Sequence, residues 1–248
     1  MYRIRAFWAP DDHQACVGFA EGHANVLREI GVKVTSGSDD WIDDPFVYVL
    51  VAEDPDNDEI VGGARIHIAH QGAELPMQSA IARVDPKIHD VVAAYAAEGT
   101  CEVCGLWNSR KVSGKGLGIS FLTRAAAAIS EQIDVGSMFA LVAKHTLKMS
   151  REKGMLPVTN VGDNGKFNYP RLNLVATAVV LKDPKTFAYA SPQERAIIKS
   201  LKEEPEQIRM EYWPRGDFEL EYLLKLKSPD WRTLNKVNNQ THELRKTL

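Results

Sequence analysis

A glycine-rich segment at residues 113–118 carries the clearest chemical signal in the chain. It holds three glycines in six positions and follows an apolar run at residues 102–107. Apolar residues then recur at helical spacing as far as Ile133, which predicts an amphipathic helix directly after the turn. Unpaired N–H groups and the positive end of the helix dipole meet at such a junction, and glycine lets a ligand approach the backbone. The segment therefore predicts binding of a phosphate or pyrophosphate group.

Basic side chains flank the same turn, and its spacing separates it from two common phosphate loops. Arg110, Lys111 and Lys115 are placed to add charge-assisted contacts to a phosphate. A nucleoside triphosphate loop needs Gly, four residues and then Gly-Lys-Ser/Thr, and the chain contains no such string. A dinucleotide fingerprint needs Gly-x-Gly-x-x-Gly within repeated strand-helix units, which the chain also lacks. The alternative is a tight strand-to-helix connection that binds no ligand.

The composition is that of an ordinary folded protein. The 248 residues are 44% hydrophobic and 25% charged, a size that predicts one domain with an extension. The formal net charge of -3 gives no general basic field for nucleic acid, so any anion site must be local. No apolar run approaches the roughly 18 residues of a membrane span, and residues 1–7 lack the apolar segment of a secretory signal. We expect a cytoplasmic protein.

Three cysteines, Cys16, Cys101 and Cys104, are too few for a disulfide framework. We expect them to be reduced. Cys101 and Cys104 form a Cys-x-x-Cys pair, but no second pair lies at the spacing of a zinc site. Side chains three apart on a strand point to opposite faces. The sequence therefore predicts two small buried residues and no metal site.

Periodicity and turn residues predict the elements that must position the glycine loop. Asp11 or Asp12 is expected to cap the first helix, and the turn at residues 54–58 joins the second and third strands into a hairpin. Strands are predicted at residues 2–9, 46–53, 60–70, 102–107, 138–144, 156–161, 172–181 and 218–226. Helices are predicted at residues 12–30, 76–98, 118–133, 146–153 and 191–202, a loop at 160–169, and a mobile tail over the last twenty or so residues.

Val112-Ser-Gly-Lys-Gly-Leu-Gly118, followed by Ile119-Ser-Phe-Leu122, resembles the acyl-coenzyme A loop of the GCN5-related N-acetyltransferase (GNAT) superfamily. The common form of that loop is Arg/Gln-x-x-Gly-x-Gly/Ala at the start of the central helix. Ser113 departs from it, and Arg110 or Lys111 is positioned to supply the missing charge. The order of elements over residues 1–182 is similar to that of the same superfamily. The resemblance implies an α+β fold whose mixed, mostly antiparallel central sheet is flanked by helices, with residues 183–248 as a helix and strand extension packed on it.

The resemblance also implies a reaction and its partners. The donor substrate would be acyl-CoA or acetyl-CoA, and the acceptor a small-molecule amine. The cysteine spacing, the net charge and the hydropathy add the expectation of no metal, no nucleic acid and no membrane span. The enzyme would be a GNAT-type N-acyltransferase, a transferase of the cytoplasm, in an oligomeric state that the sequence does not reveal. The donor would be held by Arg110, Lys111, Val112, Ser113, Gly114, Lys115, Gly116, Leu117 and Gly118.

Acyl transfer to an amine needs a base, and Glu102 is the candidate. It is an ionisable residue inside an apolar strand, where burial would raise its pKa. In the superfamily a base glutamate often occupies this strand. The alternative is a structural Glu102, ion-paired with a neighbouring strand.

A narrower resemblance links the N-terminal half to acyl-homoserine lactone synthases. These relatives carry an acidic segment before the first hairpin and then a Val-x-Gly-x-x-Arg string, and Asp40-Trp-Ile-Asp-Asp44, Tyr48-Val-Leu-Val-Ala52 and Ile60-Val-Gly-Gly-Ala-Arg65 look similar. The likeness implies a longer acyl thioester, on coenzyme A or an acyl carrier protein, and an acidic loop that receives the amine. The alternative is an acidic loop that is simply exposed to solvent.

One feature of many acetyltransferases is missing. Ser150 stands where a tyrosine commonly protonates the leaving thiolate, and His145 nearby is expected to be structural. A second class of function is therefore a non-catalytic module of the same fold that binds acyl-CoA or a partner protein.

Overall fold

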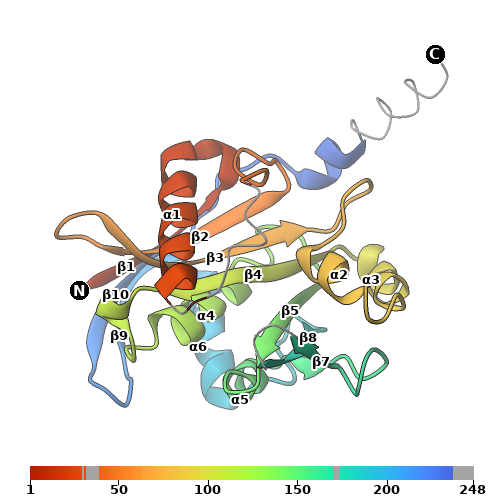
Figure 1. The fold of residues 1–248 in the computed structure, drawn as a ribbon. Helices are drawn as coiled ribbons and strands as arrows, with labels where there is room; N and C mark the ends of the chain where they lie inside the picture. Colours follow the sequence, from red (N-terminus) through yellow and green to blue (C-terminus); the bar gives the residue numbers. More distant parts are fainter. Residues whose placement is uncertain (30, 32–38, 170–173, 237–248) are drawn as a thin grey trace.

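The computed structural model describes residues 1–29, 31, 39–169 and 174–236. One open sheet runs through the molecule in the order β6-β8-β5-β4-β3-β2-β1-β10-β9, and β7 pairs with β8 (Figure 1). Neighbouring strands are antiparallel except for β4 with β5 and β1 with β10. The predicted mixed, mostly antiparallel α+β fold is confirmed. The strands are β1 Tyr2–Trp8, β2 Val47–Asp54, β3 Glu59–Ile68, β4 Thr100–Asn108, β5 Ser137–Ala143, β6 Leu156–Pro157, β7 Lys166–Tyr169, β8 Leu174–Leu181, β9 Glu206–Glu211 and β10 Phe218–Leu223.

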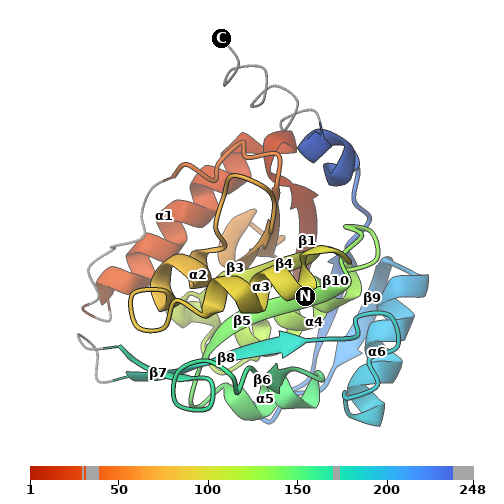
Figure 2. The same ribbon diagram turned by 90° about the vertical axis from the view of Figure 1, so that its right-hand side faces the viewer.

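Helices cover both faces of this sheet. Phe19 of α1 and Ile88 of α3 belong to two core clusters on one face, whereas Ala125 of α4 and Leu201 of α6 belong to the cluster on the other. Figure 2 shows α2 and α3 in front of the sheet and α6 beside β9. The helices are α1 His13–Glu29, α2 Pro76–Ile81, α3 Ile88–Ala96, α4 Thr123–Ala128, α5 Leu147–Glu152 and α6 Pro192–Glu203, with short helical turns η1 Ala9–Asp11 and η2 Arg110–Val112 and the π-helical segment η3 Leu117–Leu122.

The α1 helix begins and packs as its sequence requires. The Asp12 carboxylate accepts the Ala15 N–H (2.9 Å), so Asp12 caps the helix as predicted. Gly22 lets the helix approach β4, since a Cβ at this position would lie 2.1 Å from the Trp107 ring. Phe19, one turn earlier, is fully buried. The helix therefore lies tightly against the strand that carries Glu102.

Four predictions about local structure are wrong. Of the strand expected at residues 156–161, only Leu156–Pro157 forms β6. The single helix expected at residues 76–98 is two helices, because Pro86 disfavours helical geometry at Asp85 and interrupts the turn. Residues 166–169 of the expected loop form β7 on β8. The helix after the glycine turn ends at Ala128 rather than Ile133, and its first part is π-helical. Strand β9 was not predicted from the sequence.

The C-terminal region continues the central sheet. β10 pairs in parallel with β1 from Tyr2↔Leu220 onward, and β9 pairs with β10. The Trp231 indole N–H donates to the Ile133 carbonyl (2.8 Å), and Trp231 is buried. The remainder of the expected mobile tail, residues 237–248, lies outside the described residues.

No helix within the described ranges is long and apolar enough to cross a membrane.

Cys101 belongs to the core on the face that α4 covers, and Cys104 lies beside Arg65, on the face of the sheet that carries Glu102. The two cysteines thus point to opposite faces, as the strand geometry predicts.

Candidate active site

The sheet opens between β4 and β5. β4 and β5 pair in parallel only at Thr100↔Ser137, Cys101↔Met138 and Glu102↔Phe139. Beyond Glu102, β4 continues to Asn108 and β5 to Ala143 without further pairs between them. The strands therefore diverge directly after Glu102, which leaves their later residues without a neighbouring strand on that side.

A β-bulge lies in β4 beside this divergence. Gly63 pairs with Trp107 but Arg65 pairs with Cys104, so β4 holds one residue more than β3 over this stretch. Gly105 sits within it at φ +59°, a conformation that favours glycine. An isolated glycine inside a strand pattern is the sequence signal for such a bulge.

Glu102 lies on the face of the sheet that α1, α2 and α3 cover. It is 2% exposed, and its Oε2 accepts the Met77 N–H at the start of α2 (2.7 Å). Burial raises the pKa of Glu102 to about 8, against the lowering effects of the Met77 hydrogen bond and the nearby Arg65 charge. Among the described residues no cation lies within ion-pair distance of this carboxyl group. The expected structural alternative, an ion pair with a neighbouring strand, is therefore not what holds Glu102 here.

His67 is the partner of Glu102 across the β3–β4 ladder. Burial, followed by the charge of Arg65, lowers the pKa of His67 to about 3, so its imidazole is neutral at physiological pH. Its Nε2 is buried and has no hydrogen-bond partner among the described atoms. A neutral imidazole beside Glu102 adds polarity to the site without adding charge.

Arg65 lies two residues before His67 on the same face and is 9% exposed. Its guanidinium carbon lies 4.5 Å from the Trp41 ring centroid and 5.7 Å from that of Phe19. Its Nε is buried without a hydrogen-bond partner, and no described carboxylate forms an ion pair with the side chain. Burial raises the pKa of the neighbouring Cys104 thiol to about 12, so Cys104 does not neutralise the guanidinium.

The acidic segment before the hairpin contributes an aromatic ring to this site. Asp43 lies 2.9 Å from Nδ1 of His13, and the Asp44 carboxylate accepts the Phe46 N–H (2.8 Å). Asp40 is exposed. Trp41 between them is buried against Arg65. The structure therefore brings Trp41 to Arg65, whereas the carboxylates of Asp40, Asp43 and Asp44 form no ion pair with this arginine.

The glycine turn lies at the other end of β4 and begins the helical segment on the opposite face. Gly114 (φ +81°) and Gly116 (φ +79°) are in the left-handed region that glycine favours. The N–H groups of Ser120 and Phe121 both donate to the Gly116 carbonyl, the first turn of this helix. The N–H groups of the residues before Ser120 thus precede the helical ladder.

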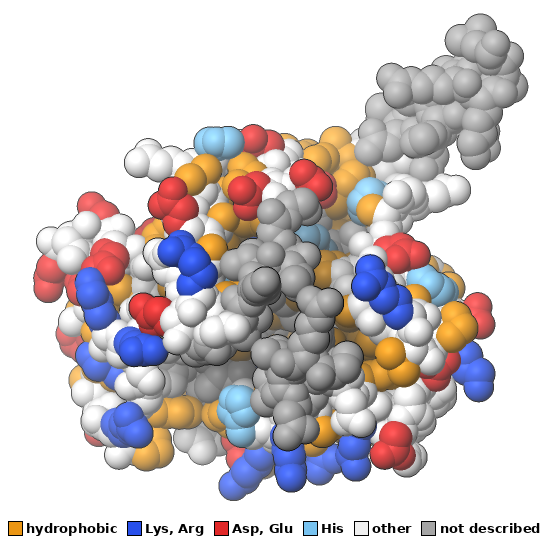
Figure 3. Space-filling model, in the orientation of Figure 1, with side chains coloured by type: hydrophobic (Ala, Val, Ile, Leu, Met, Phe, Trp, Pro, Cys, Tyr) orange, Lys and Arg blue, Asp and Glu red, His pale blue; other side chains and the backbone are white. Residues whose placement is uncertain are grey.

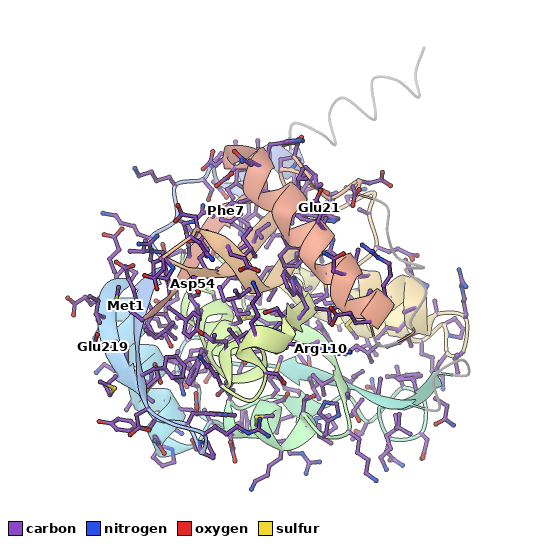
Figure 4. All side chains as sticks on the ribbon, turned by 60° about the vertical axis from the view of Figure 1, so that its left-hand side comes forward. Met1, Phe7, Glu21, Asp54, Arg110 and Glu219 are labelled. Carbon is purple, nitrogen blue, oxygen red and sulfur yellow. The ribbon has the colours of Figure 1, made fainter. Side chains whose placement is uncertain are left out.

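The predicted basic side chains contact residues outside the turn. Arg110 pairs with Glu29 of α1 (2.9 Å) and Lys111 with Glu59 of β3 (2.6 Å). Figure 4 shows Arg110 beneath α1, on the side of the molecule that carries Glu21. Lys115 donates to the Tyr2 hydroxyl (2.7 Å). The Arg110 and Lys111 charges are therefore matched by carboxylates, and neither compensates for Ser113 in this structure.

Of the other predicted loop residues, Val112 and Leu117 are buried core residues, Ser113 is exposed, and Gly118 lies against Asn108. Two residues that sequence analysis missed cover the turn from the β9–β10 connection. A Cβ on Gly116 would lie 2.7 Å from the Trp213 ring, and one on Gly114 would lie 2.2 Å from the Arg215 guanidinium. No local pattern marks this contact, because about 100 positions separate the two segments.

A groove of about 940 Å³ lies beside α1, between this helix and the first strands. Figure 3 views the side of the molecule that carries α1, where acidic and basic side chains lie next to each other. Arg5 in the groove pairs with Glu53 (2.9 Å) and Asp12 (2.9 Å). The other described basic residues that line the groove, Arg3, Arg110 and Lys111, also pair with carboxylates, so the groove offers no unpaired cation to an anionic ligand.

The expected acid for the thiolate has no counterpart at Ser150. This residue is buried, and its hydroxyl donates to the Thr146 carbonyl (3.2 Å) inside α5. His145 is exposed at the end of β5. The described residues hold no group of three or more His, Cys, Asp and Glu side chains arranged for a metal ion.

No family model matches this sequence, and neither does any curated protein sequence. Solved structures do resemble it. FeeM, an N-acyl amino acid synthase from uncultured soil microbes, matches with a TM-score of 0.57 at 14% identity, over 79% of this chain and 98% of its own. BjaI, a CoA-dependent acyl-homoserine lactone synthase, matches with a TM-score of 0.57 at 16% identity, over 96% and 100%. A mosquito arylalkylamine N-acetyltransferase like 5b gives 0.50 at 14% identity, over 73% and 99%. These likenesses show the fold: the chain has the N-acyltransferase fold that its motifs predict.

Proposed function

We propose that this protein is an N-acyltransferase that moves an acyl group from acyl-CoA or a related thioester to a small-molecule amine. The observation that carries the proposal is the position of Glu102. It is a buried carboxyl group without an ion-pair partner among the described residues, at the point where β4 and β5 diverge. The glycine turn lies at the end of the same strand. A thioester that enters between the strands would place its reacting carbon near Glu102 and its phosphates near the turn.

The reaction needs one proton acceptor and one leaving group. The amine nitrogen attacks the thioester carbonyl carbon, a C–N bond forms, and the C–S bond breaks. The proton lost from the amine passes to the Glu102 carboxylate, and the thiolate leaves and takes a proton from water. Glu102 then returns its proton to solvent. Because the pKa of Glu102 is raised to about 8, the group can both accept and release a proton near neutral pH.

The N–H groups of Ser113 and Lys115 donate to the Arg110 and Val112 carbonyls (3.1 Å each). The donor would therefore be bound through the other backbone N–H groups of the turn, those of Gly114 and residues 116–118, with Arg215 as an additional cation beside Gly114. The same proposal includes a donor acyl group of acetyl length or longer, carried by coenzyme A or by an acyl carrier protein. It also includes a location in the cytoplasm. BjaI is a CoA-dependent acyl-homoserine lactone synthase that has been solved with isopentyl-CoA, and this likeness supports coenzyme A as the carrier and a donor longer than acetyl.

Thiol release tests this function against a non-catalytic module of the same fold. The protein is mixed with acetyl-, hexanoyl- or decanoyl-CoA and a pool of amines, and free thiol is followed over time. An acyltransferase releases thiol only when donor and amine are both present. A binding module retains acyl-CoA without releasing thiol, and that result would favour the alternative.

A substitution at Gly116 tests the donor loop. Gly116→Ala should weaken binding of acyl-CoA at least tenfold, about 1.4 kcal/mol. Gly116 has a positive φ that alanine adopts only with strain, and the added methyl group obstructs the backbone that would receive the pyrophosphate. Calorimetric titration with acyl-CoA measures the change. Because the same methyl group would also meet the Trp213 ring, the control is the double variant Gly116→Ala/Trp213→Ala. If the double variant regains full affinity, the glycine serves only to admit Trp213, and the loop is not the donor site.

A further inference from the structure

We propose that Arg65 binds a carboxylate of the acceptor, so that the amine acylated by this protein is an amino acid or a closely related amino carboxylate. The inference rests on the proposed acyl transfer and names the acceptor class of that reaction. Arg65 would be a residue that determines specificity, distinct from Glu102, which would act on the amine.

The guanidinium of Arg65 is buried without a compensating charge. Burying a charged group is costly unless it is paired, and arginine is almost never fully buried alone. The chain follows this rule at Arg124, which is 5% exposed and pairs with both Glu194 (2.8 Å) and Glu211 (2.7 Å). Arg65 is 9% exposed and has no such partner among the described residues. Arg65 is therefore a buried arginine whose charge no described carboxylate neutralises.

The side chains around Arg65 cannot provide that anion. Two aromatic rings, Trp41 and Phe19, contact the guanidinium, while its Nε lacks a hydrogen-bond acceptor. Cys104 is a neutral thiol, because burial raises its pKa to about 12. Glu102 directs an oxygen to the Met77 N–H, and burial keeps this group largely protonated at neutral pH. The Arg65 guanidinium therefore keeps an uncompensated positive charge. It packs against the two rings and can bind a planar anion through two hydrogen bonds.

The spacing suits a molecule with an amine close to its carboxylate. Arg65 pairs across the sheet with Cys104, and Glu102 lies two residues along β4 on the same face. Same-face neighbours on a strand are separated by about 6.6 Å. A small amino carboxylate held by Arg65 can therefore present its nitrogen toward Glu102, where β4 and β5 diverge. An amine without a carboxylate would enter beside an unneutralised guanidinium.

Matched acceptor pairs test the inference. We would measure kcat/KM with decanoyl-CoA for tyrosine against tyramine, methionine against 3-(methylthio)propylamine, and phenylalanine against phenethylamine. The wild-type protein should prefer the amino acid of at least one pair by about 100-fold, because the acceptor carboxylate completes a buried ion pair. In Arg65→Met this preference should fall to about threefold or less, through loss of activity on the amino acid alone.

Two controls separate this role from a structural one. Arg3→Met removes an arginine from the same sheet that is already paired with Glu221 (2.6 Å), and it should keep the preference. Arg65→Met should unfold at the same temperature as the wild type or higher, because it removes an unpaired buried charge. Arg65→Lys, which keeps a charge but not the bidentate fork, should retain an intermediate preference.

The outcomes distinguish the two proposals. Thiol release with tyramine-type amines at rates equal to or above those with amino acids would leave acyl transfer standing and overturn the role of Arg65. The same conclusion follows if Arg65→Met keeps the full preference, or if it lowers the unfolding temperature so that Arg65 is a packing residue. Absence of thiol release from the wild type with every pair would overturn the proposed function and this inference together.

Discussion

Replacing Glu102 with Gln should lower turnover by about 10²- to 10⁴-fold while leaving donor affinity unchanged, the usual worth of a general base. Gln keeps the size of the side chain, and its oxygen can still accept the Met77 N–H. The folded structure should therefore survive. Steady-state rates with acyl-CoA and an active amine, together with a donor titration, measure both quantities. Glu98→Gln, in an exposed residue just before β4, is the matched control and should behave like the wild type.

The pH dependence of the same variant identifies the proton acceptor. When kcat/KM is expressed against the concentration of unprotonated amine, the wild-type value should rise with pH and level off above about 8, because Glu102 must lose its proton to act as a base. In Glu102→Gln this limb should disappear, and the remaining rate should follow the free amine alone. A variant with near-normal turnover and an unchanged profile would remove Glu102 from the mechanism.

Stability gives an independent reading of Glu102. Its folded pKa of about 8 lies above the ordinary value of 4.5, so the folded state favours the protonated form. The contribution of this group is fully present below about pH 4.5 and is lost as the pH rises through about 8. Glu102→Gln should therefore unfold at the same temperature as the wild type at pH 5, and at a higher one at pH 9. A lower unfolding temperature at both pH values would indicate a structural role.

Arg124→Met should lower the free energy of unfolding by about 3–5 kcal/mol, because it leaves the buried carboxylate of Glu211 and the half-buried carboxylate of Glu194 without their main partner. Arg124 on α4 pairs with Glu194 on α6 (2.8 Å) and Glu211 on β9 (2.7 Å). The Tyr222 hydroxyl of β10 also donates to Glu211 (2.8 Å). These contacts join the helix after the glycine turn to the C-terminal extension. Urea unfolding followed by fluorescence measures the loss.

A charge-matched variant sets the limits of this expectation. Arg124→Met combined with Glu194→Gln and Glu211→Gln removes the uncompensated charges and should recover most of the lost stability. If residues 183–236 form a separate unit, Arg124→Met should produce two unfolding transitions. A loss below about 1 kcal/mol in a single transition would show that the buried ion pairs contribute little to joining the extension to the sheet.

The sequence by itself determined the parts of this protein that depend on neighbours along the chain. Periodicity and capping located α1 with its Asp12 cap, the β2–β3 hairpin and the turn before η3, since these depend on residues a few positions apart. The same local signals placed Glu102 inside an apolar strand. Pro86 is a local signal for the break between α2 and α3, although the single helix predicted at residues 76–98 did not take it into account.

Only the tertiary structure decided which distant residues meet at the candidate site. The register of β3 against β4 sets Arg65 beside Cys104 and His67 beside Glu102, and a one-residue shift would turn these side chains to the opposite face. Trp41 reaches Arg65, and Trp213 and Arg215 reach the glycine turn, through packing between segments that no local pattern links. Charge pairing is decided in the same way, because a carboxylate becomes a partner only where folding places it. The sequence contains 33 acidic residues. Folding decides that none of those the structure describes forms an ion pair with the guanidinium of Arg65.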